Sequence, residues 1–322
     1  MAFENSPKNR QLEIALELNK AAASQGKESN FMQWWYFDTN CISELVKLSS
    51  VGYADKVQEF LMGKDVLLTS TSMQELSKAP DILRYAPSAF KTANLFLAPD
   101  ITKFWYSDFI NFFNDDENRI PMNSLDVYPL KSDLIEMVLN SRKTEFDKAC
   151  EIFEKEISSE FHASVGPDIG ANMDERDLCV HIWNVVNEYS QEWFKLRIPQ
   201  ADLCAANFPS FYSYFYAYYF RYVKNRDAKL ELNDALDLAN CMVVPYCEKY
   251  YCEAKFANVL KNVKGRRPPT AFQLIKKMYK KGLITSEIFQ AQRKDKEKLS
   301  RTSELLANTQ IFSFSEMRSQ ML

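Results

Sequence analysis

The feature that most constrains the fold is a short unit made of an apolar strand, an acidic residue and a helix. It is clearest at residues 34–40, where four consecutive aromatic residues are typical of a buried strand and Asp38 follows them. Ile42, Leu45 and Val46 then recur at helical spacing. The carboxyl end of a strand is the edge where open α/β sheets bind ligands, so Asp38 is a candidate for chemistry there.

Two further junctions of this kind follow along the chain. A predicted helix over 55–62 leads to a predicted strand over 65–69, and Glu75 lies in the helix that opens after it. A third predicted strand over 249–252 runs directly into Glu253. Because the carboxyl ends of parallel strands share one edge of a sheet, we expect these acids to converge with Asp38.

A pair of aspartates precedes the third strand. Asp234 and Asp237 are three residues apart, which puts both on one face of a helix near its start. We expect this helix to bring at least one further carboxylate to the same edge.

Each junction also has a purely structural interpretation. Asp, Thr and Asn are ordinary helix N-caps, so a cap at Asp38 is the alternative to a catalytic acid. Ser72 and Glu75 have the spacing of a capping box, which would explain Glu75 without any ligand.

Composition narrows the class of protein. With 322 residues and 46% hydrophobic content, the chain can bury the core of one enlarged domain or of two domains. Its 7 glycines form no phosphate-binding motif, and His162 and His181 are too few for a histidine-rich metal site. The 7 cysteines lack paired spacing, as expected of reduced thiols. With no secretory signal and no segment that could span a bilayer, we expect a cytoplasmic protein without a membrane partner.

The alternation of strands and helices is interrupted after Pro80, where helical patterns such as 133–161 and 178–196 take over. We therefore expect an N-terminal helical arm over 1–30, a first core part over 31–80, a helical insertion over 81–205, a second core part over 206–260, a basic helical hairpin over 261–306, and the last strand and helix of the core over 307–322.

Residues 208–222 are dense in aromatic side chains. Stacking on nucleic-acid bases is one interpretation. An aromatic stripe within a helix more often packs in the core, so we expect most of these rings to be buried.

The segment 261–301 carries thirteen Lys and Arg residues against three acids, a local charge of +10 in a chain of net charge −3. Helices over 272–281 and 286–298, with Gly282 as a C-cap, predict a basic hairpin. Phosphate binding by such a surface is one expectation, and a merely solvated helical face is the other. The candidate nucleic-acid contacts are Lys276, Lys277, Lys280, Lys281, Arg266 and Arg267.

Together these motifs resemble those of the PIN-domain nucleases. In that family a strand ends in Asp followed by Thr or Ser and Asn, as at Asp38-Thr39-Asn40, and a second acid opens a later helix in a Thr/Ser-rich context, as Glu75 does. An Asp-bearing helix then precedes a strand that runs into T-x-D-x-x-F, with which residues 251–256 line up.

The chain departs from the family pattern in three respects. Tyr251 and Glu253 stand where the family has Thr and Asp. Asp234 has the spacing of the smaller bacterial members, whereas Asp237 with residues 245–248 is similar to larger ones, so the third acid has two candidates. Compact members also lack the helical insertions.

The resemblance implies an α/β, PIN-like three-layer fold with a central parallel sheet and large helical insertions. It also implies a site for Mg²⁺ or Mn²⁺, because converging carboxylates repel one another unless a cation lies between them. Asp38 would be the central ligand, with Glu75 and either Asp234 or Asp237 beside it. Glu253 would hold a second ion or a water molecule, and Asn40 would orient Asp38 or the phosphate.

The function implied by the resemblance is metal-dependent hydrolysis of RNA by an endoribonuclease, acting as a toxin or a phage-defence effector. One alternative is a structure-specific DNA nuclease of the same superfamily. Another is a non-catalytic scaffold of this fold, whose helical insertions bind a protein partner or inhibitor.

Overall fold

The computed structural model describes residues 34–77, 79–98, 101, 103–113, 128–130, 173–224 and 232–322. The arm predicted over 1–30, the helix predicted over 133–161, and His162 lie outside these residues.

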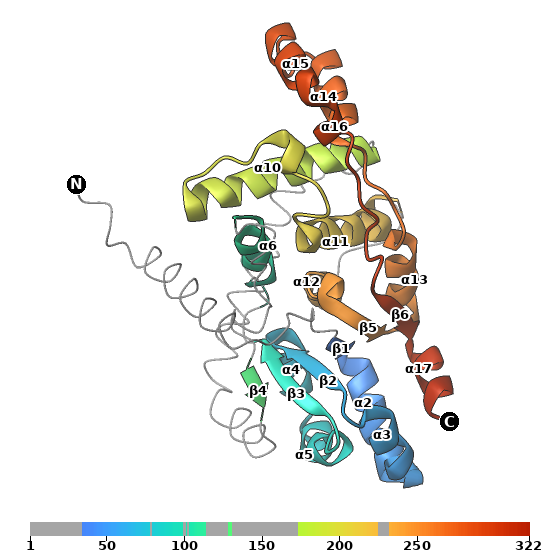
Figure 1. Cartoon of the computed structure of the whole chain (residues 1–322). Helices are drawn as coiled ribbons and strands as arrows, with labels where there is room; N and C mark the ends of the chain where they lie inside the picture. Colours follow the sequence, from blue (N-terminus) through green and yellow to red (C-terminus); the bar gives the residue numbers. More distant parts are fainter. Residues whose placement is uncertain are drawn as a thin grey trace, which may run out of the picture.

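A six-stranded sheet forms the centre of the fold (Figure 1). Its order is β4-β3-β2-β1-β5-β6, and every neighbouring pair is parallel except β3 and β4. The α/β class and the parallel sheet are thereby confirmed. The strands are β1 (Trp34–Phe37), β2 (Asp65–Thr69), β3 (Asn94–Ala98), β4 (Tyr128–Leu130), β5 (Cys247–Cys252) and β6 (Gln310–Ser313).

Alternate side chains of β1 enter two separate cores, one on each face of the sheet. Trp35 and Phe37 face one group of helices: α2 (Thr39–Leu48), α3 (Ala54–Leu61), α4 (Ser70–Ser77), α5 (Pro80–Ala89) and α17 (Phe314–Met321). Trp34 and Tyr36 face the other: α6 (Lys103–Phe113), α10 (Glu175–Phe194), α11 (Pro209–Tyr218), α12 (Leu232–Asn240) and α13 (Ala254–Val263).

The four aromatic residues of β1 are explained by its pairing with β5. Tyr36 stacks on its register partner Tyr250 and Phe37 on Tyr251, each with ring centroids 4.7 Å apart. All four aromatic side chains of β1 are almost fully buried, and they alternate between the two faces of the sheet. Large rings therefore suit this strand because both of its faces are covered.

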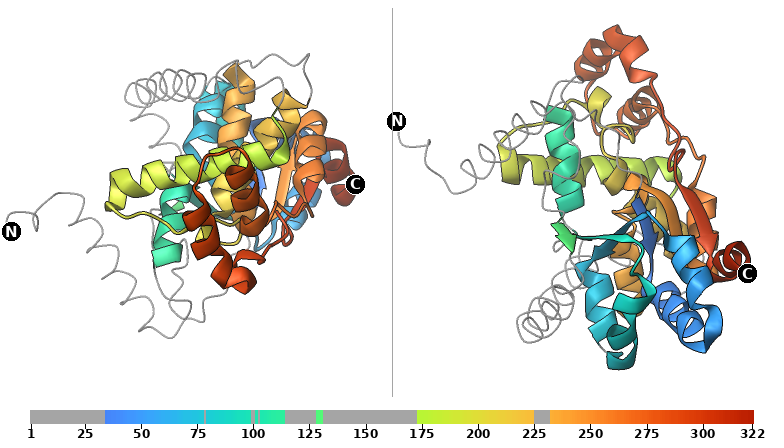
Figure 2. Two further views of the ribbon diagram at one scale, coloured as in Figure 1. Left: turned by 90° about the horizontal axis from the view of Figure 1, so that it is seen from above. Right: turned by 60° about the horizontal axis from the view of Figure 1, so that its bottom comes forward.

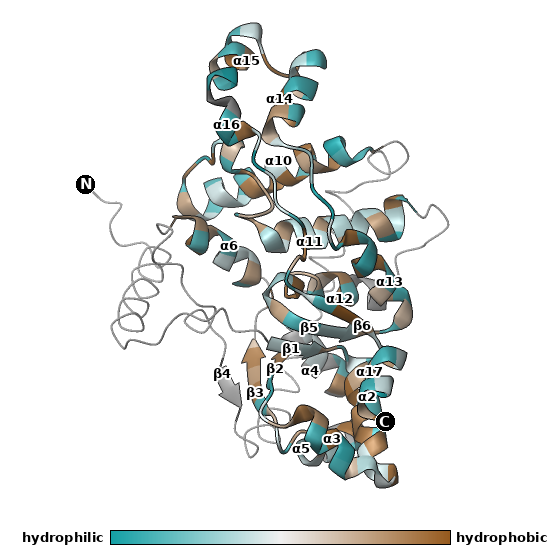
Figure 3. Ribbon diagram, turned by 45° about the vertical axis from the view of Figure 1, so that its right-hand side comes forward, coloured by the Kyte–Doolittle hydropathy of each residue, from teal (hydrophilic) through white to brown (hydrophobic). Residues whose placement is uncertain are grey.

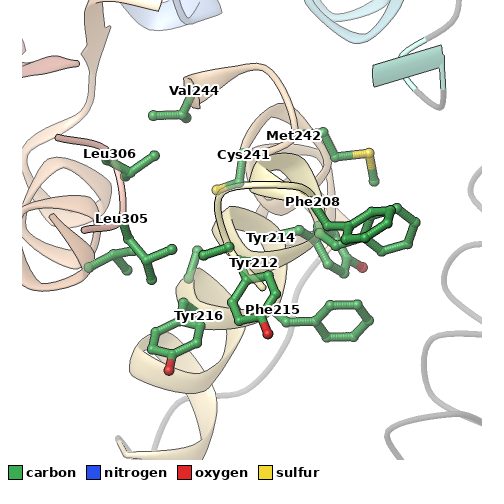
Figure 4. Packing of buried hydrophobic residues seen from close by; sticks show 14 of the residues in the cluster. Phe208, Tyr212, Tyr214, Phe215, Tyr216, Cys241, Met242, Val244, Leu305 and Leu306 are labelled. Atoms are coloured by element: carbon green, nitrogen blue, oxygen red, sulfur yellow. The ribbon is translucent and has the colours of Figure 1, made fainter. Parts of the chain in front are cut away.

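The aromatic segment predicted to be buried forms α11 and the short π-helix that continues it over Tyr219–Val223. Phe208, Phe211 and Tyr216 are fully buried. Figure 4 shows the labelled rings of this segment packed near Cys241 and Met242, which follow α12, and near Leu305. Trp105 of α6 stacks on Phe211 at 4.5 Å. The prediction of core packing is confirmed for these rings.

The prediction that strands are absent between Pro80 and Ala205 is wrong. Residues 94–98 form β3, which pairs with β2 along its whole length, and β4 adds an antiparallel edge strand. The error has a physical cause: β3 contains only three consecutive large apolar residues, Leu95, Phe96 and Leu97, and such a short run cannot be distinguished from part of a helix by periodicity.

The basic hairpin is formed by α14 (Ala271–Lys280), α15 (Ser286–Gln292) and α16 (Lys296–Leu299), with the turn Arg293–Asp295 dividing the helix predicted over 286–298. Gly282, with φ of 70°, ends α14 in the left-handed conformation that glycine favours. Of these helices α14 packs on α10, and both α14 and α16 pack on the 3-10 turn Gln200–Asp202. Figures 1 and 2 show them on the side of α10 that faces away from the sheet.

None of the helices within the described ranges is both long and apolar enough to cross a membrane.

A buried carboxylate joins α6 to α11. Asp108 is fully buried, accepts a hydrogen bond from the backbone N–H of Ser210 at 2.9 Å, and receives the hydroxyl of Tyr246 at 2.5 Å. It thereby satisfies a free N–H in the first turn of α11. Burial raises the pKa of Asp108 to about 8, against an ordinary value of 3.8, although these hydrogen bonds oppose the shift.

The raised pKa predicts how stability depends on pH. The neutral carboxyl is the form favoured by the fold, so this contribution is complete below about pH 4 and is lost as the pH rises to about 8. Asp108→Asn should fold normally and remove this dependence, because its oxygen can accept the Ser210 N–H while its amide donates to the Tyr246 hydroxyl. Urea unfolding of the wild type and of Asp108→Asn between pH 5 and pH 9 would measure how the free energy of unfolding of each depends on pH.

Asp108→Ala is the matched comparison. It leaves buried donors of Ser210 and Tyr246 without a partner and should lower the free energy of unfolding by roughly 2–4 kcal/mol. Parallel stability curves for the wild type and Asp108→Asn across this pH range would contradict the assignment.

Candidate acidic site at the carboxyl edge of the sheet

Asp38 is held by three hydrogen bonds that join two strand-to-helix junctions. Its backbone N–H donates to the carbonyl of Tyr251 at 2.9 Å, which extends the β1–β5 ladder by one residue. Its Oδ1 accepts the N–H of Cys41 at 2.7 Å, and its Oδ2 accepts the N–H of Glu253 at 2.8 Å. Asp38 therefore caps α2, as the structural alternative predicted, and it also binds the start of α13.

The position of Asp38 in the sheet has topological significance. From β1 the chain adds β2 and β3 on one side, and it later adds β5 and β6 on the other. The helices that follow β1 and β5 also leave toward opposite faces, since α2 packs in one core and α13 in the other. Ligands of open α/β sheets bind at such a switch point, and Asp38 and Glu253 are the first residues beyond its two strands.

Glu75 is linked to the same edge through Thr39. The Thr39 hydroxyl, in the first turn of α2, donates to Oε2 of Glu75, which is half-buried on α4. The residue next to Asp38 thus holds the second predicted acid.

The charges of the predicted acids act on shared buried neighbours. Burial raises the pKa of the Cys252 thiol, the last residue of β5, well above its ordinary value, and the charges of Asp38, Asp237 and Glu253 raise it further. Burial likewise raises the pKa of the Tyr36 hydroxyl, with smaller contributions from the charges of Glu75 and Asp38. The charges of four of the predicted acids therefore act on buried groups of β1 and β5.

Asp234 and Asn40 are the two remaining predicted residues of the site. Asp234 lies on α12 together with Asp237, as predicted, and Asp237 is half-buried. The side chain of Asp234 is not among those described. Asn40 is exposed in the first turn of α2 and makes no described hydrogen bond with Asp38. Backbone N–H groups orient Asp38 instead.

The site has an excess of negative charge. Burial raises the pKa of Asp38 to about 6; the N–H groups of Cys41 and Glu253 oppose this, and the charge of Glu253 adds to it. None of the ion pairs in the described part of the chain involves Asp38 or Glu253. A buried carboxylate without a cationic partner is costly, and a bound cation would remove that cost.

The donor set suits a hard cation, because it consists of carboxylates without histidine. Among the described residues, however, no three Asp, Glu, His or Cys side chains are close enough together to hold a metal ion. The acids surround one edge of the sheet, and binding of a metal would require them to draw closer.

Sequence reasoning missed a set of uncharged side chains at this edge. Thr69, Thr71 and Ser72 form buried hydrogen bonds with one another, with Tyr36 and with Asn240 of α12. The available signal was the Thr/Ser-rich run after β2, which was interpreted as a capping box and as the context of Glu75, with no role for its hydroxyl groups. The partner Asn240 is 169 residues from Thr71 and had no local signal.

The predicted nucleic-acid contacts divide into two groups. Lys277 pairs with Asp174 at 2.7 Å and Asp177 at 2.8 Å, and Lys281 pairs with Asp177, which ties α14 to the start of α10. Arg267 pairs with Glu304 at 2.6 Å, and Arg266 lies over the ring of Phe220. Lys276 and Lys280 are exposed and form no ion pair with any described residue.

Comparison with known proteins identifies no relative: no protein-family model, curated protein or solved structure matches this chain.

Proposed function

We propose that the chain is a metal-dependent endoribonuclease of the PIN type, which hydrolyses RNA phosphodiester bonds at the carboxyl edge of its sheet. The observation that carries the proposal is the position of Asp38 at the topological switch point, hydrogen-bonded to the junction that carries Glu253. Glu75 and Asp237 come from the neighbouring elements α4 and α12. This arrangement supports the interpretation that Asp38 belongs to a ligand-binding site in addition to capping α2.

The residues of the chain have separable roles in this proposal. Asp38, fixed by two N–H groups, would be the central ligand, with Glu75, Asp237 or Asp234, and Glu253 around it. Thr39 would keep Glu75 turned toward Asp38. A bound Mg²⁺ or Mn²⁺ would supply a water molecule of lowered pKa and stabilise the charge of the phosphate. The choice of RNA over DNA rests on the family resemblance.

Glu75→Gln is the sharpest test of cleavage. Glutamine keeps an oxygen that can accept the Thr39 hydroxyl, so the fold should persist while a charged ligand is removed. We expect Mn²⁺-dependent cleavage of single-stranded RNA to fall at least ~100-fold, since metal stabilisation of the transition state is worth several kcal/mol. Asp65→Asn is the control, because Asp65 lies at the opposite edge of the sheet, where it binds Asn94; its activity should match the wild type.

Asp38→Asn should abolish cleavage as well. Both oxygens of Asp38 accept N–H groups, whereas the amide of asparagine can accept only one of them, so the thermal unfolding of Asp38→Asn must be measured alongside its activity.

Wild-type rates in folded Glu75→Gln would overturn the proposed chemistry. Cleavage of DNA alone would favour the DNA nuclease, and the absence of both Mn²⁺ uptake and cleavage in the wild type would favour the non-catalytic scaffold.

We further propose that RNA is bound by the exposed lysines of the basic hairpin. An acidic body repels phosphate, so affinity has to come from a local positive surface. In Figure 3 hydrophilic residues cover much of α14 and α16, and Lys276 and Lys280 are the exposed members of α14 that no described acid neutralises.

Replacing Lys276 and Lys280 with Glu should therefore weaken RNA binding and reduce its salt dependence by roughly 0.7 in log–log slope for each phosphate that the protein no longer neutralises. Fluorescence anisotropy of RNA binding at low and at high salt would measure both the loss of affinity and the change in salt slope. The matched variant carries Ala at Lys277 and Lys281, whose ion pairs hold α14 against α10. It should lower the unfolding temperature and change the salt slope less. An unchanged slope in the first variant would exclude this surface from RNA binding.

A further inference from the structure

The basic hairpin exposes apolar side chains as well as lysines. Tyr279, Leu283 and Ile288 lie close together in the sequence, and they are exposed by 40%, 62% and 45%. In Figure 1 the helices α14 and α15, which carry two of these residues and flank the third, project at the top of the molecule beyond α10. Exposed apolar side chains that gather in one place, bordered by charged ones, indicate a binding surface.

The ring of Tyr279 is held in place at the end of α14. It stacks on the ring of Phe289 of α15, with centroids 4.6 Å apart and planes inclined by 9°. Two hydrogen bonds close the turn after it: the N–H of Gly282 donates to the carbonyl of Tyr279 at 3.0 Å. The N–H of Leu283 donates to the carbonyl of Met278, also at 3.0 Å. Because Phe289 covers one face of the ring, the exposure of Tyr279 comes from the other face and the ring edge.

The two exposed lysines of α14 lie on the same side of the helix as this ring. Lys276, Tyr279 and Lys280 have the i, i+3, i+4 spacing that puts residues on one helix face, and all three are exposed. Lys277, in contrast, points to α10, where it pairs with Asp174. A nucleotide has the chemistry complementary to this face, since it joins a flat base to a phosphate. Proteins that bind single strands combine positive side chains with aromatic rings in this way.

We propose that Tyr279 stacks on an unpaired base of a bound nucleic acid while Lys276 and Lys280 contact the phosphates beside it. This inference rests on the proposed binding of RNA by the hairpin, and it adds what the hairpin distinguishes. A base within a duplex is already stacked between its neighbours and offers no free face, so the surface selects single strands over duplexes. Stacking does not involve the 2′-hydroxyl group, so it does not distinguish RNA from DNA.

Tyr279→Ala tests the stacking contact. Binding of a fluorescein-labelled single-stranded RNA of mixed sequence to the full chain would be measured by fluorescence anisotropy in EDTA, so that no strand is cleaved. We expect the affinity to fall roughly 10- to 100-fold, as it does when an aromatic ring under one base is replaced by alanine. The salt slope should stay at its wild-type value, because the ring neutralises no phosphate. Tyr279→Phe keeps the ring and should bind as the wild type does.

Two controls separate stacking from a change in the shape of the hairpin. On a strand whose bases are replaced by abasic sites, the wild type and Tyr279→Ala should bind with equal affinity. Weaker binding of the abasic strand by Tyr279→Ala would attribute the loss to the fold of the hairpin and overturn the stacking role. Tyr53→Ala is the matched variant, since Tyr53 is also 40% exposed and lies between α2 and α3, on the other side of the sheet. Its affinity should equal that of the wild type.

The outcomes distinguish this inference from the proposed nuclease. Wild-type affinity of Tyr279→Ala for the intact single strand would overturn the stacking role, leave the nuclease standing and assign the exposed apolar residues to a protein partner. Equal affinity of the wild type for a single strand and for the duplex of the same sequence would overturn the selectivity. Failure of the nuclease would appear separately, as the absence of Mn²⁺-dependent cleavage by a protein whose binding still depends on Tyr279.

Discussion

The structure depends on one carboxylate that accepts N–H groups from two strand-to-helix junctions. Through Oδ1 Asp38 starts α2, and through Oδ2 it fixes the first residue beyond β5, so the two strands beside the switch point end in register. Stacking of Tyr36 on Tyr250 and of Phe37 on Tyr251 holds the same strands from both faces. One side chain therefore both caps a helix and joins two strand-to-helix junctions that are far apart in the sequence.

This double role explains why the sequence could predict the location of the site better than its details. The aromatic run ending in Asp38, the strand over 65–69 and the junction at Glu253 are local patterns, and all three were predicted at or within two residues of their bounds. The hydrogen bond from the Glu253 N–H to Asp38 spans 215 residues, and no local pattern could indicate it. For the same reason Asn240 was overlooked, since its partners Thr69 and Thr71 lie on another strand-to-helix junction.

The errors away from the site also have physical causes. The strand β3 was missed because its apolar run is short and because its stability comes from pairing with β2, which is a tertiary effect. Within the charge run over 261–301 the helix predicted over 272–281 corresponds to α14, and the one predicted over 286–298 is divided into α15 and α16. Charge alone could not separate lysines that hold α14 on α10 from those that face solvent. That distinction depends on Asp174 and Asp177, which lie far earlier in the chain.

The pairing of β1 with β5 also determines when the acidic edge can exist. Asp38 and Glu253, which meet across this pair, are 215 positions apart, so closing the loop between them costs entropy that only the completed pair can repay. During synthesis β1, β2 and β3 can associate early, whereas Asp38 obtains the N–H of Glu253 only after β5 has emerged and paired. The acidic edge is therefore assembled late in folding, and a nascent chain that lacks β5 carries Asp38 without the partner that fixes it.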